Sequence, residues 1–135
     1  MAIEAHRNPP TLFRVIIPVT DIEQAAAFYG AVLDMPGERV STHRHYFACG
    51  ETILACVNVA ERRLDFRPNL EHFYFAVDDL EGAYKRAGQA GCEWLEEGIA
   101  ERDWGERSFY ARDPFGNPIC FVDRATTFTG GRFVP

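Results

Sequence analysis

The sequence contains an internal repeat, and a repeat constrains the fold of a chain more strongly than any local pattern does. Segments 19–25 (VTDIEQA) and 77–83 (VDDLEGA) agree at five of seven positions when Ile and Leu are counted as equal, and they lie 58 residues apart. Each follows a run rich in β-branched and aromatic residues, at 12–17 and 72–77, which is typical of a strand. The repeat therefore predicts two copies of one unit in which a strand leads into a helix.

Each copy carries the signature of a helix start. Segments 20–23 (TDIE) and 78–81 (DDLE) both place a capping side chain three residues before a glutamate. Apolar residues then recur at helical spacing, and in the first copy they are Ile22, Ala25, Ala26, Tyr29, Val32 and Leu33. We expect the first helix to end at Pro36 and Gly37 and the second at Gly91, because these residues stop helices.

Short strands are expected after each helix, at about 38–42, 44–49, 52–59, 93–97, 106–112 and 118–123. The order strand, helix and three strands thus occurs twice, which predicts an α+β fold of two βαβββ modules whose curved mixed sheets surround a cleft. The predicted organisation is a flexible N-terminal extension at 1–10, a first module at 11–60, a connector at 61–70, a second module at 71–124 and a C-terminal tail at 125–135.

Composition excludes several classes of function. The 135 residues are 47% hydrophobic and 25% charged, as in an ordinary globular domain, and the net charge of −6 counts against nucleic acid as a partner. No apolar run reaches the length of a membrane span or a signal peptide, so no membrane partner is expected. The four cysteines form no CxxC pair, which together with the missing signal favours a cytoplasmic location.

Three stretches, at 21–33, 72–80 and 104–119, resemble motifs of the vicinal oxygen chelate superfamily, which includes glyoxalase, the extradiol dioxygenases and the bleomycin-resistance proteins. The last stretch (WGERSFYARDPFGNPI) is most similar to the closing hairpin of bleomycin-resistance-like members. The resemblance covers about residues 11–124 and implies two modules that enclose a cleft. It also implies a homodimer, with an exchange of modules between chains left open.

Metal-using members of this superfamily supply one ligand from each of four strands. Carried over to this chain, the four positions are Arg14, a residue within 54–56, His72 and Cys120. A guanidinium cannot ligate a metal, 54–56 contains no carboxylate or imidazole, and only His72 matches the usual residue type. We therefore expect no cofactor. The alternative is a divalent metal held by His43, His45 and His72, in a metal-dependent lyase, isomerase or dioxygenase.

The favoured function is the binding of a small organic molecule. Arg14 and His72 are separated by the repeat offset and so are expected to face each other across the cleft between the modules, where a guanidinium suits an anionic oxygen. Tyr74 and Trp104 are candidates for apolar walls, and Cys120 completes the predicted ligand-binding set. Catalysis stays open, because His72 is a possible acid or base and Cys120 a possible nucleophile. A structural or regulatory dimer whose cleft is vestigial is a further alternative. For Arg14 itself, the alternative is that it pairs with an acidic neighbour or reaches solvent and has no chemical role.

Overall fold

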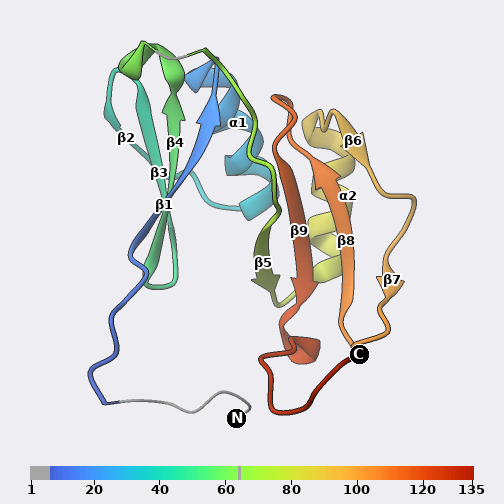
Figure 1. Ribbon diagram of the computed structural model, residues 1–135. Coiled ribbons are helices and arrows are strands. Elements are labelled where there is room, and N and C mark those ends of the chain that lie inside the picture. Colours follow the sequence, from blue (N-terminus) through green and yellow to red (C-terminus); the bar gives the residue numbers. More distant parts are fainter. Residues whose placement is uncertain (1–6, 64) are drawn as a thin grey trace.

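The computed structural model describes residues 7–63 and 65–135, and it confirms the α+β class and the two βαβββ modules (Figure 1). The first module contains β1 (Arg14–Val19), α1 (Ile22–Leu33), β2 (Glu38–Ser41), β3 (Arg44–Cys49), β4 (Thr52–Asn58) and the 3-10 helix η1 (Val59–Arg62). The second contains β5 (Phe73–Val77), α2 (Leu80–Ala90), β6 (Trp94–Leu95), β7 (Ala100–Glu101), β8 (Arg107–Arg112), β9 (Pro118–Asp123) and the 3-10 helix η2 (Arg124–Thr126). Part of the predicted N-terminal extension, residues 1–6, lies outside the described residues, as does residue 64 of the connector.

Each module forms one mixed sheet. The first sheet has the order β1-β4-β3-β2 and the second the order β5-β9-β8-β6, with β7 also paired to β8. The first strand of each module runs parallel to the last, and the other pairs are antiparallel. The β1 edge of one sheet and the β5 edge of the other face each other across the middle of the molecule (Figure 1).

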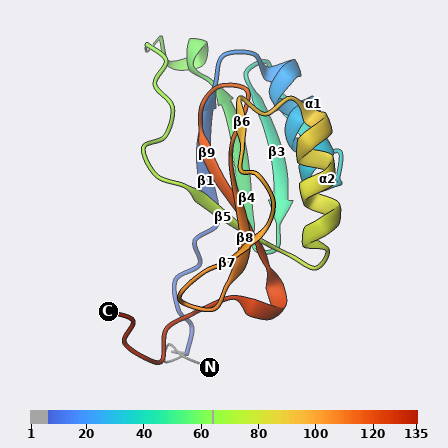
Figure 2. The ribbon, with the colours of Figure 1, turned by 90° about the vertical axis from the view of Figure 1, so that its right-hand side faces the viewer.

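Both helices cover the same side of the two sheets, so the other side of each sheet has no helix over it (Figure 2). We call this second side the open face. The side chains toward the helices form a core that runs through both modules, and its largest fully buried members are Tyr29, Phe28, Phe47, Phe109 and Phe121. Phe109, Phe121 and Phe75 stack in a row across the second sheet, with ring centroids 5.2 Å and 5.1 Å apart. Because this shared core fills the helix side of both sheets, side chains that can contact a ligand from the sheets lie on the open faces.

The helix boundaries differ from the predicted ones by a few residues. Asp21 caps α1 by accepting from the backbone N–H of Gln24, and Asp79 caps α2 in the same way, so each cap lies one residue after the predicted one. The helix α1 ends at Leu33 rather than at Pro36, because Asp34 adopts a left-handed conformation with φ 56° and closes the last turn. Gly91 ends α2 as expected, with φ 92°.

A buried polar cluster joins the two modules. The Tyr29 hydroxyl on α1 donates to Asp113 Oδ2 at 2.6 Å, and Asn117 Nδ2 donates to the same oxygen at 2.9 Å and to the Pro18 carbonyl at 2.7 Å. The backbone N–H groups of Phe115 and Asn117 donate to Asp113 Oδ1. Burial raises the pKa of Asp113, although these hydrogen bonds act in the opposite direction. The closing turn of the second module is therefore fixed to the first.

Part of the predicted tail packs on the second module. The Phe128 N–H donates to Glu106 Oε2 at 2.8 Å, and Arg132 donates to the Trp104 carbonyl and stacks on the Phe128 ring. The strand expected at 93–97 is present only as the short β6, and a second short strand that was not predicted, β7, follows a bend at Gly98 with φ 89° and also pairs with β8. Neither α1 nor α2, the longest helices in the described parts of the chain, is long and apolar enough to cross a membrane.

Candidate ligand-binding site

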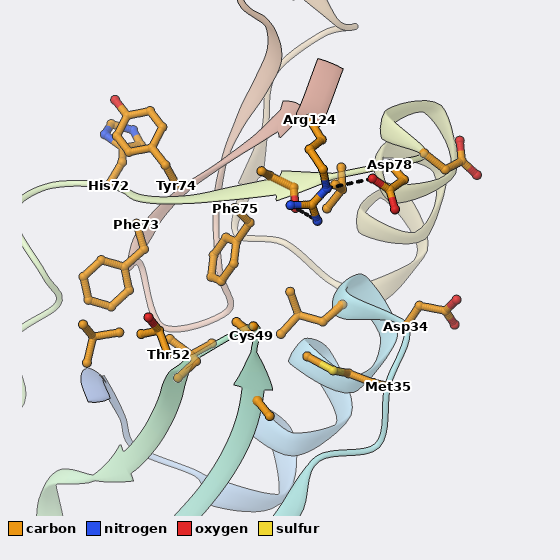
Figure 3. Close-up of a pocket in the computed structure, with 18 of the residues that line it drawn as sticks. Asp34, Met35, Cys49, Thr52, His72, Phe73, Tyr74, Phe75, Asp78 and Arg124 are labelled. Carbon is orange, nitrogen blue, oxygen red and sulfur yellow. Dashed lines mark hydrogen bonds and ion pairs between the residues drawn. The ribbon is translucent and has the colours of Figure 1, made fainter. Parts of the chain in front are cut away.

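Four of the five predicted ligand-binding residues belong to the second module, and three of them lie on the open face of its sheet. Strand alternation turns His72 and Tyr74 away from Phe73 and Phe75, as Figure 3 shows. In the strand register Tyr74 is opposite Cys120, and Cys120 is opposite Tyr110, so these three side chains share one face. The His72 ring lies 4.9 Å from the ring of Tyr110 and 6.0 Å from that of Tyr74.

The fourth residue, Trp104, joins Tyr74 in a pocket on this face. The pocket has a volume of about 460 Å³, and its lining residues are Tyr74, Ala76, Trp104, Glu106, Val122, Thr127, Phe128 and Thr129. Glu106 fixes two of its walls, because Oε1 accepts from the Trp104 indole N–H at 2.7 Å and Oε2 accepts from the Phe128 N–H. We call it the aromatic pocket. The C-terminal tail supplies one wall, which no sequence pattern predicted.

An ion pair lies behind Tyr110 on the same face. Arg102 donates to both carboxylate oxygens of Glu96 and to the Ser108 hydroxyl, and its guanidinium lies 4.6 Å from the Tyr110 ring centroid. Burial acts to raise the pKa of Glu96, but the hydrogen bonds from Arg102 and from the Tyr110 N–H outweigh it and lower that pKa. The charge of Arg102 is thus already neutralised.

Cys120 is unsuited to nucleophilic chemistry. Its side chain is fully buried, and burial raises the pKa of its thiol to about 11. A thiol with so high a pKa is almost entirely protonated at neutral pH, and the thiolate is the reactive form. His72 makes no ion pair or side-chain hydrogen bond within residues 7–63 and 65–135, so no carboxylate there orients it as a base.

Arg14, the fifth predicted residue, belongs to the first module. Its guanidinium stacks 4.9 Å from the Phe13 ring centroid and 5.6 Å from that of Tyr46, at the start of β1. It is exposed, it does not line the aromatic pocket, and in the described part of the chain it forms no ion pair. The structure records no contact between Arg14 and His72 or Cys120 among the described residues, and their meeting across a cleft stays a prediction.

The register identifies the fourth metal-ligand position of the superfamily. Ile16 is opposite Ala55 as Tyr74 is opposite Cys120, and Ile16 and Tyr74 are separated by the repeat offset, so Ala55 is the counterpart of Cys120. The four positions then carry a guanidinium, a methyl group, an imidazole and a buried thiol. This donor set does not fit a divalent metal site, which needs several imidazole or carboxylate ligands.

The alternative set of three histidines is also not assembled. His43 lies in the turn before β3 rather than on a strand with His45. His45 is buried on the helix side, with Nε2 2.9 Å from the Pro36 carbonyl and its ring against Phe47, whereas His72 is on the open face of the other sheet. Within residues 7–63 and 65–135 no three His, Cys, Asp or Glu side chains are grouped as metal ligands.

A larger pocket, of about 850 Å³, lies between the two modules along the free edge of β5 (Figure 3). Its apolar walls include Phe73 and Phe75 from β5 and Leu33 and Met35 from the end of α1. We call it the inter-module pocket. Arg86 of α2 also lines it, and sequence reasoning missed this residue because an arginine beside the apolar stripe of a helix carries no distinctive signal.

Comparisons with known proteins agree with this fold. Residues 11–121 match the model of the Glyoxalase/Bleomycin resistance protein/Dioxygenase superfamily. A glyoxalase/bleomycin resistance protein from Albidiferax ferrireducens T118 superposes with a TM-score of 0.70 at 24% identity, covering 83% of this chain and 98% of its own. Lactoylglutathione lyase from Agrobacterium tumefaciens gives a TM-score of 0.65 at 22% identity, covering 90% of this chain and 100% of its own.

A glyoxalase-related enzyme from Fulvimarina pelagi has a TM-score of 0.73 at 17% identity, over 84% of this chain and 87% of its own. No curated protein matches the sequence. Because the family model covers most of the chain, the protein belongs to the glyoxalase/bleomycin resistance protein/dioxygenase superfamily, as its motifs indicated. Structural similarity at these identities defines the fold and leaves the chemistry to the residues of the site.

Proposed function

We propose that the protein binds a planar organic molecule on the open faces of its sheets, with the aromatic pocket as the principal contact and without a catalytic divalent metal. The observation that carries the proposal is the presence of Tyr74 and Trp104, from separate segments, in one pocket, with His72 and Cys120 on the same face. Aromatic walls with a few polar groups are typical of small-molecule sites. Binding without turnover is the mode that the resemblance to bleomycin-resistance-like members implies.

The proposed ligand carries an anionic oxygen. Arg14 offers a guanidinium with no ion pair among the described residues, and this group binds carboxylate, phosphate or enolate oxygens with two parallel hydrogen bonds. Arg102 cannot take this role, because Glu96 already occupies its fork. A ligand that extends from the aromatic pocket across the cleft between the modules would place its charge at Arg14.

Two features support binding rather than catalysis. The four positions that hold a metal in other members carry unsuitable residues here, and the pKa of the Cys120 thiol is raised to about 11.

We also propose that two chains associate and complete each other's clefts. The exposed side chains of Leu12 and Phe13, just before β1, support an association, since they are 69% and 58% exposed to solvent. Sedimentation velocity at two concentrations tests it, and a monomer at both contradicts it.

Calorimetric titration with 2-naphthoate and with neutral 2-naphthol tests the binding proposal. Trp104→Ala should weaken binding of both probes roughly tenfold, because it removes a large aromatic contact. The matched control is Trp94→Ala, since Trp94 is the only other tryptophan and is 43% exposed on the edge strand β6. Arg14→Met should weaken 2-naphthoate and leave 2-naphthol unchanged. Equal effects of the two tryptophan substitutions, or a stoichiometric divalent ion in untagged protein, would overturn the proposal.

A further inference from the structure

The inter-module pocket has two apolar walls from different modules. On one side β5 turns Phe73 and Phe75 toward it, and on the other lies Met35 (Figure 3). Val77 and Leu33 also line it. Its volume of about 850 Å³ is in the range of sites that hold whole organic molecules. Tyr74 and Ala76 line both pockets, so the inter-module pocket adjoins the aromatic pocket at β5. Phe73, Phe75 and Met35 line only the former, and Trp104 and Phe128 line only the latter.

Most charged groups that line the inter-module pocket already have partners. Arg124 Nε donates to Asp78 at 2.7 Å, and Arg124 Nη2 donates to the Ala76 carbonyl at 2.9 Å. The Asp79 carboxylate accepts from the backbone N–H of Gly82 as the cap of α2. The neighbouring Asp34, at the end of α1, is an exposed carboxylate on the same rim.

Arg86 is different from these groups. Its Nε is buried and has no hydrogen-bond acceptor in the described parts of the chain, and its guanidinium forms no ion pair there. A buried donor without an acceptor is costly, and a charged donor more so. A ligand oxygen that accepts from Arg86 would remove this cost, and a carboxylate matches the guanidinium fork best.

We propose that the inter-module pocket is a second binding site, for a monocarboxylic acid with an apolar tail, and that Arg86 binds the carboxylate. The tail packs between Phe73 and Phe75 on one side and Met35 on the other. The rim favours a single negative charge on the ligand, because Asp34 and Asp79 would repel a second one. The site does not depend on the function proposed above for the open face.

The test uses octanoate, with 1-octanol as the neutral match and octanedioate as the dianion. Met35 is one of two methionines and Trp104 one of two tryptophans, so the Met35 methyl and the Trp104 indole N–H report on the two pockets separately in NMR spectra. Octanoate should shift the Met35 methyl in a saturable way and leave Trp104 unchanged, and octanedioate should bind more weakly. A shift at Trp104 alone, or no saturable shift at Met35, overturns the proposal.

Substitutions then test the carboxylate contact. Arg86→Met keeps an apolar stem and should weaken octanoate roughly ten- to a hundredfold, while 1-octanol changes less than about twofold. Arg86→Lys should restore part of the loss, and exposed Arg67→Met in the connector is the matched control. Unchanged octanoate affinity in Arg86→Met contradicts the proposal. If the Arg86→Met variant does not fold, the Met35 methyl shift of the wild-type protein with octanoate still tests whether the pocket binds. The titration with 2-naphthoate tests the aromatic pocket, and its result does not affect this test.

Discussion

The two modules place different side chains at equivalent positions of the same scaffold. Arg14 in β1 corresponds to His72 just before β5, and Ala55 in β4 corresponds to Cys120 in β9. The open face of the second sheet gathers aromatic rings around Tyr110, whereas the first offers a guanidinium above one tyrosine. The repeat therefore specifies where side chains lie, and the individual residues specify what each module can bind.

The closing turns of the modules differ as much as the open faces do. The turn between β3 and β4 is short, and Gly50 takes φ 62° there in open space. The turn between β8 and β9 carries Asp113, which is fully buried and hydrogen-bonded to α1 of the other module. Only the second of these turns thus connects the modules through a buried carboxylate.

The largest expected effect, a loss of stability, tests this difference between the turns. Asp113→Ala removes the acceptor of Tyr29, Asn117 and two backbone N–H groups, and it should lower the free energy of unfolding by about 3 kcal/mol. Urea denaturation followed by circular dichroism measures it. The control is Glu51→Ala in the first turn, with an expected change within about 0.5 kcal/mol. Equal losses in the two variants would show that the turns have equivalent roles.

A smaller change isolates the contact between the modules. Tyr29→Phe removes only the hydroxyl that donates to Asp113 at 2.6 Å, so it should cost about 1–2 kcal/mol in the free energy of unfolding. Because Asp113 is the acceptor of this hydrogen bond, Tyr29→Phe should cost little free energy of unfolding when it is made in an Asp113→Ala background. A double-mutant cycle measures this coupling, and strict additivity would contradict the account.

A third prediction compares the observed cap of α1 with the residue that the sequence pattern favoured. Asp21→Ala removes the cap of α1 and should lower the free energy of unfolding by about 1 kcal/mol. Thr20→Ala changes the residue that the sequence pattern favoured as the cap, yet its side chain is exposed and caps nothing here, so it should cost about 0.3 kcal/mol or less. Thermal denaturation measures both losses, and a larger loss for Thr20→Ala than for Asp21→Ala would identify Thr20 as the cap, as the sequence pattern predicted.

The smallest expected effects are on thiol reactivity. Cys49 in the first module is half-buried and Cys120 in the second is fully buried, and burial raises the pKa of both thiols. A raised pKa lowers the thiolate fraction at a given pH, so alkylation should be slow at neutral pH and accelerate as pH rises. Peptide mass spectrometry after iodoacetamide treatment should show Cys49 modified before Cys120. Rapid modification of Cys120 would instead indicate a nucleophile.

Much of the fold could be predicted from the sequence, because hydrophobic periodicity and the repeat are local signals. The helices and the longer strands are present where expected, and the alternation that turns Phe109 inward and Tyr110 outward follows from strand geometry. Cap positions were displaced by one residue, since adjacent Thr20 and Asp21 both suit the role.

The candidate sites were predictable only in part. Tyr74 and Trp104 were found through motifs, but Phe128 reaches the same pocket through the path of the tail, which depends on hydrogen bonds to Glu106. The link from Asp113 to Tyr29 is a contact between modules, and such long-range contacts leave no periodic trace in the sequence. The sequence also gives no sign that Arg86 Nε is buried without an acceptor in the described parts of the chain.

One titration tests the central claim, that the open face of the second module binds an organic ligand without a metal. Protein treated with EDTA and dialysed is titrated with 2-naphthoate, and the two indole N–H resonances are followed, with Trp94→Ala assigning them. The account predicts a saturable shift of the Trp104 resonance that is the same before and after EDTA. Binding that is lost with EDTA and returns only with a divalent ion would contradict it.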